Sequence, residues 1–350
     1  MGSPTDTNFI LQGFQRLQNT NNILLGLSVG SLGVFHILSA HYPQLKPLVS
    51  KRKCLLKDAD TVVIYADNEI AVVPVKTIAE IPNFRYFEFR RQRYVFQESN
   101  FTLQESIFTG SCVDVHEATM SAMDAQFFRK KHGLNVIDIK VPPLKAMLTQ
   151  RLVQPFYLFQ LFSIFIWIYT GYLTFSLVIL LSTIASIAHE IYLHRRSITD
   201  LKKMLPKSAN NRYSCIRDGE EFKLGAQEMV VGDVVILNHA TQVPCDIALI
   251  KGECIVDESS MTGEAIPSVK TSLLKDSRPF TVDRFKSSVV FKGTRILQAK
   301  NPTGGDVVGV VVATGSSSSM GQLFTSLLHP KKLVSSFLIP LTFFLEFQVL

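Results

Sequence analysis

Two long apolar runs, residues 152–169 and 173–193, follow one another with only a few residues around Gly171 between them. Each run approaches the length of about 20 residues that an α-helix needs to cross the hydrocarbon core of a bilayer. Lys and Arg residues flank the pair on both sides, which is typical of helix ends that stay in the cytosol. The sequence therefore predicts a transmembrane helical hairpin over residues 151–196.

Two further apolar runs lie near the ends of the chain. Residues 23–40 contain three glycines and His36, so this run could cross the bilayer once or bend back within one leaflet. Residues 333–350 follow two lysines and are predicted to begin another membrane helix. The net charge of +7 would suit either nucleic acid or an anionic membrane face, and the apolar runs decide for the membrane. We expect no nucleic-acid partner.

The segments outside these runs favour β-structure. Residues 61–78 and 84–96 alternate between β-branched or aromatic residues and polar residues, as strands of a small cytosolic domain do. The basic residues of the second run either form a solvated face or attract anionic lipids. Residues 1–21 are rich in Asn, Gln and Thr, and we expect them to be poorly ordered.

A second β-rich segment follows the predicted hairpin. After a polar connector at residues 197–211, short apolar runs alternate with Gly and Asn turn signals as far as about residue 323. This pattern predicts a compact antiparallel β domain in the cytosol, and residues 208–326 are expected to fold alone as a soluble unit. The fold class is thus a multi-pass α-helical membrane protein with cytosolic β-rich domains.

The five cysteines do not form a recognisable ligand set. Their spacing matches neither a zinc site nor a CxxC pair, so reduced thiols are expected and no metal-binding residue is proposed. They are Cys54, Cys112, Cys215, Cys245 and Cys254.

The most informative stretch is residues 242–270, which reads QVPCDIALIKGECIVDESSMTGEAIPSVK. A short β-rich part leads into a tight loop centred on Thr262, Gly263 and Glu264. As a tripeptide, Thr-Gly-Glu is common in solvated turns. Together with the preceding Pro-Cys-Asp and Asp-Glu-Ser and the following Ala-Ile-Pro, it resembles the actuator domain of P-type ATPases, the pumps that phosphorylate themselves on aspartate.

This resemblance implies a catalytic role for the loop. Glu264 would hold a water molecule against the aspartyl phosphate and take its proton as a general base. Gly263 would let the loop tip approach the phosphorylated domain, and Thr262 would orient the tip. The family usually has Ser after the Glu, whereas this chain has Ala265. The departure affects a secondary contact and leaves the glutamate in place.

Residues 133–168 resemble the fifth subfamily of P-type ATPases, and in particular its polyamine-transporting branch. The similarity lies in an Asn-x-Ile stretch ahead of the helix and in the Pro-Phe-Tyr-x-Phe-Gln entry that begins at Pro155. The resemblance implies that residues 22–42 re-enter the membrane rather than cross it. It also implies an endosomal, lysosomal or vacuolar membrane.

The sequence lacks the other motifs of a complete pump. It contains neither the Asp-Lys-Thr-Gly-Thr phosphorylation motif nor the Gly-Asp-Gly-x-Asn-Asp hinge for magnesium. The resemblance implies ATP and Mg²⁺ for the complete pump, and we expect this chain alone to bind neither and to be inactive. Its expected partners are the lipid bilayer, including anionic lipids, and the remaining pump domains.

Two functions remain open at this stage. The chain is either the N-terminal portion of an ATP-driven cation or polyamine transporter, or a truncated, non-catalytic membrane protein with a lipid-binding or regulatory role. The expected units are a polar N-terminus (1–21), a membrane-associated segment (22–42), a cytosolic β-rich domain (43–150), the helical hairpin (151–196), the actuator domain (197–330), which we expect to be a distorted antiparallel β structure, and the start of a third helix (331–350).

Overall fold

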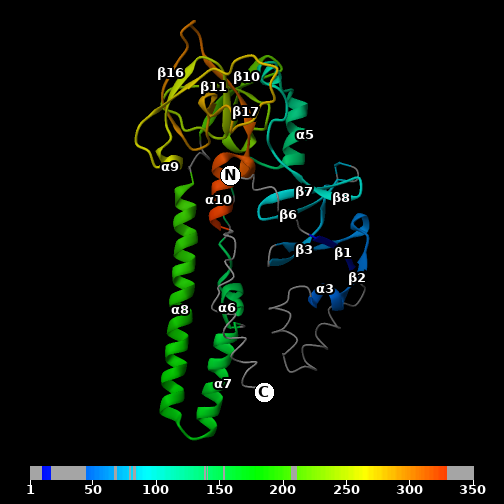
Figure 1. Cartoon of the computed structure of the whole chain (residues 1–350), viewed down its shortest axis with the longest axis vertical. Coiled ribbons are helices and arrows are strands. Elements are labelled where there is room, and N and C mark those ends of the chain that lie inside the picture. The colour runs from blue at the N-terminus through cyan, green and yellow to red at the C-terminus, as the bar shows by residue number, and fades with distance from the viewer. Residues whose placement is uncertain are drawn as a thin grey trace.

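The computed structural model in Figure 1 describes residues 10–16, 45–66, 69–78, 80–81, 84–137, 139, 141–152, 154–205 and 211–328. The segments predicted to re-enter the membrane at residues 22–42 and to begin a third helix at 331–350 lie outside the described residues. The described chain forms an N-terminal β unit, a helical pair and a second β unit that includes α10 (Ser319–Leu328).

Two antiparallel four-stranded sheets make up the N-terminal β unit, in the orders β2-β1-β3-β4 and β5-β6-β7-β8. A shared core of Val, Ile and aromatic side chains lies between them and includes Ile64, Phe87 and Phe101. The elements are β1 (Ile10–Arg16), α3 (Leu45–Ser50), β2 (Lys51–Cys54), η1 (Leu56–Asp58), β3 (Thr61–Ala66), β4 (Glu69–Pro74), β5 (Lys76–Thr77), β6 (Arg85–Phe89), β7 (Gln92–Gln97) and β8 (Asn100–Gln104). The strands predicted over residues 61–78 and 84–96 are thus confirmed.

The prediction of disorder over residues 1–21 is wrong for residues 10–16. They form β1, which lies between β2 and β3 and pairs with both. Phe14 is buried and Leu11 packs against the core of the unit. Burial of these two side chains and pairing on both edges stabilise the strand despite its polar composition.

The predicted helical pair consists of α7 (Pro155–Tyr169) and α8 (Leu173–Met204), preceded by α6 (Leu144–Leu152). Figure 1 shows α7 and α8 extending side by side away from the second β unit. Among the described residues, α8 is the one helix long and apolar enough to cross a membrane, and α7 is a shorter apolar helix. The structure alone therefore does not confirm the multi-pass prediction.

Helix α8 is longer than the sequence predicted. It continues past residue 193 to Met204, so the first part of the predicted polar connector is helical. Near the middle of the long helix, Glu190 forms an ion pair with Arg151 at 2.6 Å and accepts a hydrogen bond from Tyr157 at 3.2 Å. These contacts fasten α6 and α7 to α8.

The second β unit is built from antiparallel sheets, as predicted. One has six strands in the order β10-β9-β11-β17-β12-β15, and the other has three in the order β14-β13-β16. Register shifts in β12 and β13 give the distorted geometry that was predicted. The elements are β9 (Arg212–Arg217), β10 (Glu220–Gly225), η3 (Ala226–Glu228), β11 (Val234–Leu237), β12 (Asp246–Lys251), β13 (Glu253–Asp257), α9 (Ser259–Thr262), β14 (Ser268–Thr271), η4 (Lys286–Ser288), β15 (Val289–Val290), β16 (Arg295–Lys300), β17 (Val307–Ala313) and η5 (Gly315–Ser317).

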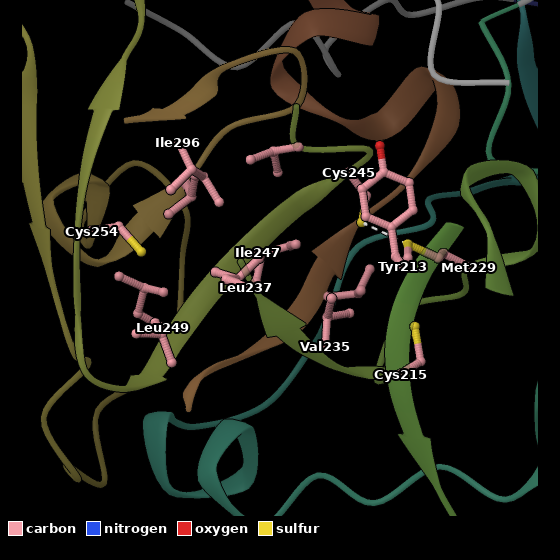
Figure 2. Packing of buried hydrophobic residues seen from close by; sticks show 14 of the residues in the cluster. Tyr213, Cys215, Met229, Val235, Leu237, Cys245, Ile247, Leu249, Cys254 and Ile296 are labelled. Atoms are coloured by element: carbon pink, nitrogen blue, oxygen red, sulfur yellow. Dashed lines mark hydrogen bonds between the residues drawn. The ribbon is translucent and has the colours of Figure 1, made fainter. Parts of the chain in front are cut away.

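The main core of this unit contains side chains from both sheets. Ile247 and Leu249 of β12 lie beside Ile296 and Cys254 of the smaller sheet (Figure 2). At the other side of this core, Cys245 lies near Met229 and Tyr213. The alternation of buried and outward residues along β9, β11 and β13 matches the period of two that predicted strands here.

Residues 106–137 of the predicted unit 43–150 pack on the second β unit. Helix α4 (Cys112–His116) contributes to a core that contains Ala248, and α5 (Ala122–His132) packs against Val230. Backbone bonds also join the two segments, as where Phe108 N–H donates to the carbonyl of Val312 at 2.7 Å. The β unit after the membrane helices therefore completes its core with residues that precede them.

Candidate functional site

The Thr-Gly-Glu loop lies at the end of a hairpin. Strands β13 and β14 pair so that Val256 lies opposite Ser268 and Cys254 opposite Lys270. Residues 258–267 connect the two strands and begin with the single helical turn α9. Because one strand pair fixes both ends of the connection, the loop projects from a defined base.

Local hydrogen bonds shape the start of the loop. Asp257 accepts from the backbone N–H of Ser259 at 2.9 Å, and hydrogen bonding to Ser259 lowers the pKa of the Asp257 carboxyl. The carbonyl of Glu258 then accepts from the N–H groups of Met261 and Thr262 at 2.9 and 3.0 Å. These hydrogen bonds close the single helical turn of α9, Ser259–Thr262.

Gly263 ends α9 in the left-handed conformation, with φ 76° and ψ −3°. Its N–H donates to the carbonyl of Ser259 at 3.0 Å, which is a normal way to finish a helix. A Cβ at this position would meet no atom within 4 Å, so space does not demand glycine. The backbone conformation does, because L residues with a side chain are strained there.

Thr262 links the turn to the glutamate. Its hydroxyl donates to the carbonyl of Glu258 at 3.1 Å and accepts from the backbone N–H of Glu264 at 3.2 Å. The carboxylate of Glu264 is exposed and forms no hydrogen bond or ion pair with any described residue. The structure thus brings together all three predicted residues and leaves the carboxylate facing outward.

Met261 connects the loop to the helices. It packs against the buried cluster of Ile139, Met320 and Phe324, against which Ile198 and Leu201 of α8 also pack. Residues 262–267 are exposed, whereas Met261 is partly covered by this cluster. The start of the loop that carries Glu264 and the C-terminal part of α8 therefore pack against the same buried cluster.

The second β unit also contains a buried polar network that the sequence did not reveal. Asp246 accepts from the N–H of Lys292 at 2.8 Å and from the N–H and hydroxyl of Ser319. The ammonium of Lys292 donates to the side-chain oxygen of Asn135 at 2.8 Å. Burial raises the pKa of Asp246 and lowers that of Lys292 to about 8. Asp246 belongs to the Pro-Cys-Asp run, and its contacts assign that run a structural role.

No metal site accompanies the loop. Within the described ranges, no three His, Cys, Asp or Glu side chains come together as ligands. The described cysteines are all free thiols, and four of them are buried. The chemistry available at the loop is that of one exposed carboxylate held on a short, hydrogen-bonded turn.

Comparison with known proteins adds to this geometry. Residues 204–328 match the family model of the P-type ATPase actuator domain. Residues 204–328 are the actuator domain of a P-type ATPase. The match includes the hairpin, its loop and α10, and confirms the resemblance drawn from residues 242–270.

Relatives extend the similarity beyond the actuator domain. Human polyamine-transporting ATPase 13A2 is 34% identical over 278 residues, which cover 78% of this chain and 23% of that protein. Mouse polyamine-transporting ATPase 13A3 is 34% identical over 263 residues, covering 71% of the chain and 22% of the relative. Human probable cation-transporting ATPase 13A5 is 30% identical over 261 residues, which cover 71% of this chain and 21% of that protein.

The chain thus spans about a fifth to a quarter of the length of these relatives. Their names confirm the resemblance to the polyamine-transporting branch. Together with the family match, they favour the actuator portion of a P-type ATPase over a truncated protein with a separate regulatory role.

Proposed function

We propose that the actuator domain of this chain dephosphorylates the aspartyl phosphate of a P-type pump, with Glu264 as the general base. The exposed carboxylate next to the left-handed Gly263 carries the proposal, because it can enter a facing active site without displacing any described partner. Glu264 would hold the attacking water and accept its proton. The Thr262 hydroxyl would keep the glutamate backbone in place.

The complete protein would be an ATP-driven transporter of cations, with polyamines as the favoured substrate class. The names of the 13A2 and 13A3 relatives support this choice. The family implies dependence on ATP and Mg²⁺. The part of the reaction assigned to this chain is water activation and positioning by the loop itself.

We further propose that α7 and α8 cross the bilayer as a hairpin with both outer ends in the cytosol. Large apolar side chains such as Phe159, Phe165 and Leu177 are exposed along both helices, and so large an apolar surface suits contact with lipid. Trp167 and Tyr172 lie at the hairpin turn, where aromatic residues meet the membrane surface. The proposed partners are the bilayer, its anionic lipids and the remaining pump domains, in an endosomal, lysosomal or vacuolar membrane.

The test is an exchange in the human 13A2 relative, in which residues 106–328 replace the corresponding residues, because residues 106–137 complete the core of the actuator domain. The exchanged pump should form phosphoenzyme from ATP and turn over. Glu264→Gln should keep the loop shape but remove the base. Phosphoenzyme should then form and persist, while steady-state turnover falls by roughly 10²-fold or more.

The matched control is Glu221→Gln, which neutralises an exposed carboxylate on β10 of the same domain. It should leave the decay of phosphoenzyme unchanged. A Glu264→Gln pump that loses its phosphate at the normal rate would show that Glu264 is not the base.

A further inference from the structure

The loop that carries Glu264 has few anchors apart from Met261. Residues 262–267 are exposed, and α9 is a single turn, too short to hold itself in water. We propose that Lys270 is a positioning residue for dephosphorylation, because its ammonium fixes Glu258 at the start of the turn that presents Glu264. This inference rests on the proposed role of Glu264.

Lys270 is held by three separate contacts at the base of the hairpin. Its ammonium nitrogen lies 2.7 Å from a carboxylate oxygen of Glu258, and it donates a hydrogen bond to the carbonyl of Lys286 at 3.0 Å. It also lies over the ring of Phe291, 4.9 Å from the ring centre. The contact with Glu258 lacks the angles of a hydrogen bond and acts as a close ion pair.

The ion pair is well shielded from water. The side chain of Lys270 is 6% exposed and that of Glu258 is 13% exposed. Shielding strengthens the attraction between the two charges and makes either charge costly to leave alone. An ion pair between exposed side chains would contribute little, so burial is what gives this one an ordering role.

Glu258 is the residue through which the pair acts on the loop. Its carbonyl accepts the N–H groups of Met261 and Thr262 and the hydroxyl of Thr262. Fixing the side chain of Glu258 therefore fixes the acceptor around which α9 closes. The same Thr262 hydroxyl binds the N–H of Glu264, so three contacts in series lead from the ammonium to the catalytic residue.

The first test measures loop order in the full 350-residue chain in detergent, without any pump activity. Millisecond hydrogen exchange is followed at the amides of Thr262 and Gly263, which donate within α9. In Lys270→Met these amides should exchange at least tenfold faster, while amides of β12 stay protected. The control is Lys275→Met, at an exposed lysine of the same domain. It should change the exchange rates of neither the α9 amides nor the β12 amides.

A double variant separates pairing from general destabilisation. Glu258→Gln alone should also speed exchange at α9, and Glu258→Gln with Lys270→Met should be no faster than Lys270→Met. Two effects that multiply would overturn the inference, since they would show that the residues act independently. Equal acceleration at β12 and α9 would overturn it too, because Lys270 would then stabilise the whole domain.

The second test uses the exchanged pump described above. Lys270→Met should slow phosphoenzyme decay by at least tenfold without changing the rate of phosphoenzyme formation. If Glu264→Gln has no effect on decay, the proposed function fails. If Glu264→Gln traps the phosphoenzyme and Lys270→Met decays normally, the positioning role of Lys270 fails while the proposed function stands.

Discussion

Asn135→Ala should destabilise the actuator domain from outside the region that matches the family model. Asn135 precedes the membrane helices in sequence, yet its side chain is 4% exposed within the second β unit. Its amide nitrogen donates to the carbonyls of Ala226 and Pro244 at 2.8 and 2.9 Å. Its oxygen accepts from the ammonium of Lys292 at 2.8 Å and from the N–H of Gly315 at 2.9 Å.

The magnitude follows from what the substitution leaves behind. Truncation deprives four buried groups of a partner, and each such group costs about 1–3 kcal/mol, with the charged ammonium at the high end. Because the four groups surround one site and relax together, we expect a total of about 4 kcal/mol. For a unit of this size, that corresponds to a lowering of the unfolding midpoint by about 10 °C.

The assay uses the buried cysteines of the actuator domain as reporters in the full chain. Cys215 and Cys245 are both fully buried, so a thiol reagent labels them when the domain unfolds and does not report on the membrane helices. The midpoint of labelling against temperature should fall by about 10 °C in Asn135→Ala. Asn238→Ala, at an exposed position, should shift it by less than about 2 °C. If Asn135→Ala lowers the labelling midpoint by no more than the Asn238→Ala control does, the reasoning is refuted.

Three other substitutions or treatments have defined outcomes. Gly309→Ala would place a Cβ 2.8 Å from the carbonyl oxygen of Ala248 and should cost about 1–3 kcal/mol in denaturant unfolding. Burial lowers the pKa of His132 to about 4, so the unfolded chain binds a proton between pH 6.5 and 4 that the folded chain does not. The free energy of unfolding should therefore fall as pH falls through that window. His132→Gln should make the free energy of unfolding less dependent on pH there. Burial raises the pKa of Cys215 to about 12, so alkylation of the native chain at pH 8 should modify the partly exposed Cys54 and spare Cys215.

The features that the sequence predicted correctly are local ones. Alternation with a period of two located most strands, because a half-buried strand imposes that period on neighbouring residues. The loop was predictable for a similar reason. Thr262, Gly263 and Glu264 are consecutive, and the hydrogen bonds that shape the turn span no more than four residues.

The features that the sequence missed depend on contacts between distant residues. Asn135 binds Lys292 across more than 150 positions, and no local pattern marks either residue as a partner of the other. Strand β1 is missed for the same reason, since its order comes from pairing with β2 and β3. The expectation that residues 208–326 fold alone omits α4 and α5, which bury Cys112, Val115 and Ala125 against that segment. A fragment intended to fold should include residues 106–137.

The connector after the membrane helix was misjudged although a local signal was present. Polar residues dominate residues 197–205, and that composition suggested a polar connector. Ile198, Leu201 and Leu205 recur at spacings of three and four, which is the period of one helical face. That face packs against the buried cluster of Ile139, Met320 and Phe324, so the helix continues because this cluster supplies the apolar partner. Periodicity was therefore the better guide than composition, and it marks the face of α8 that packs against the same buried cluster as Met261, the residue before the Thr-Gly-Glu loop.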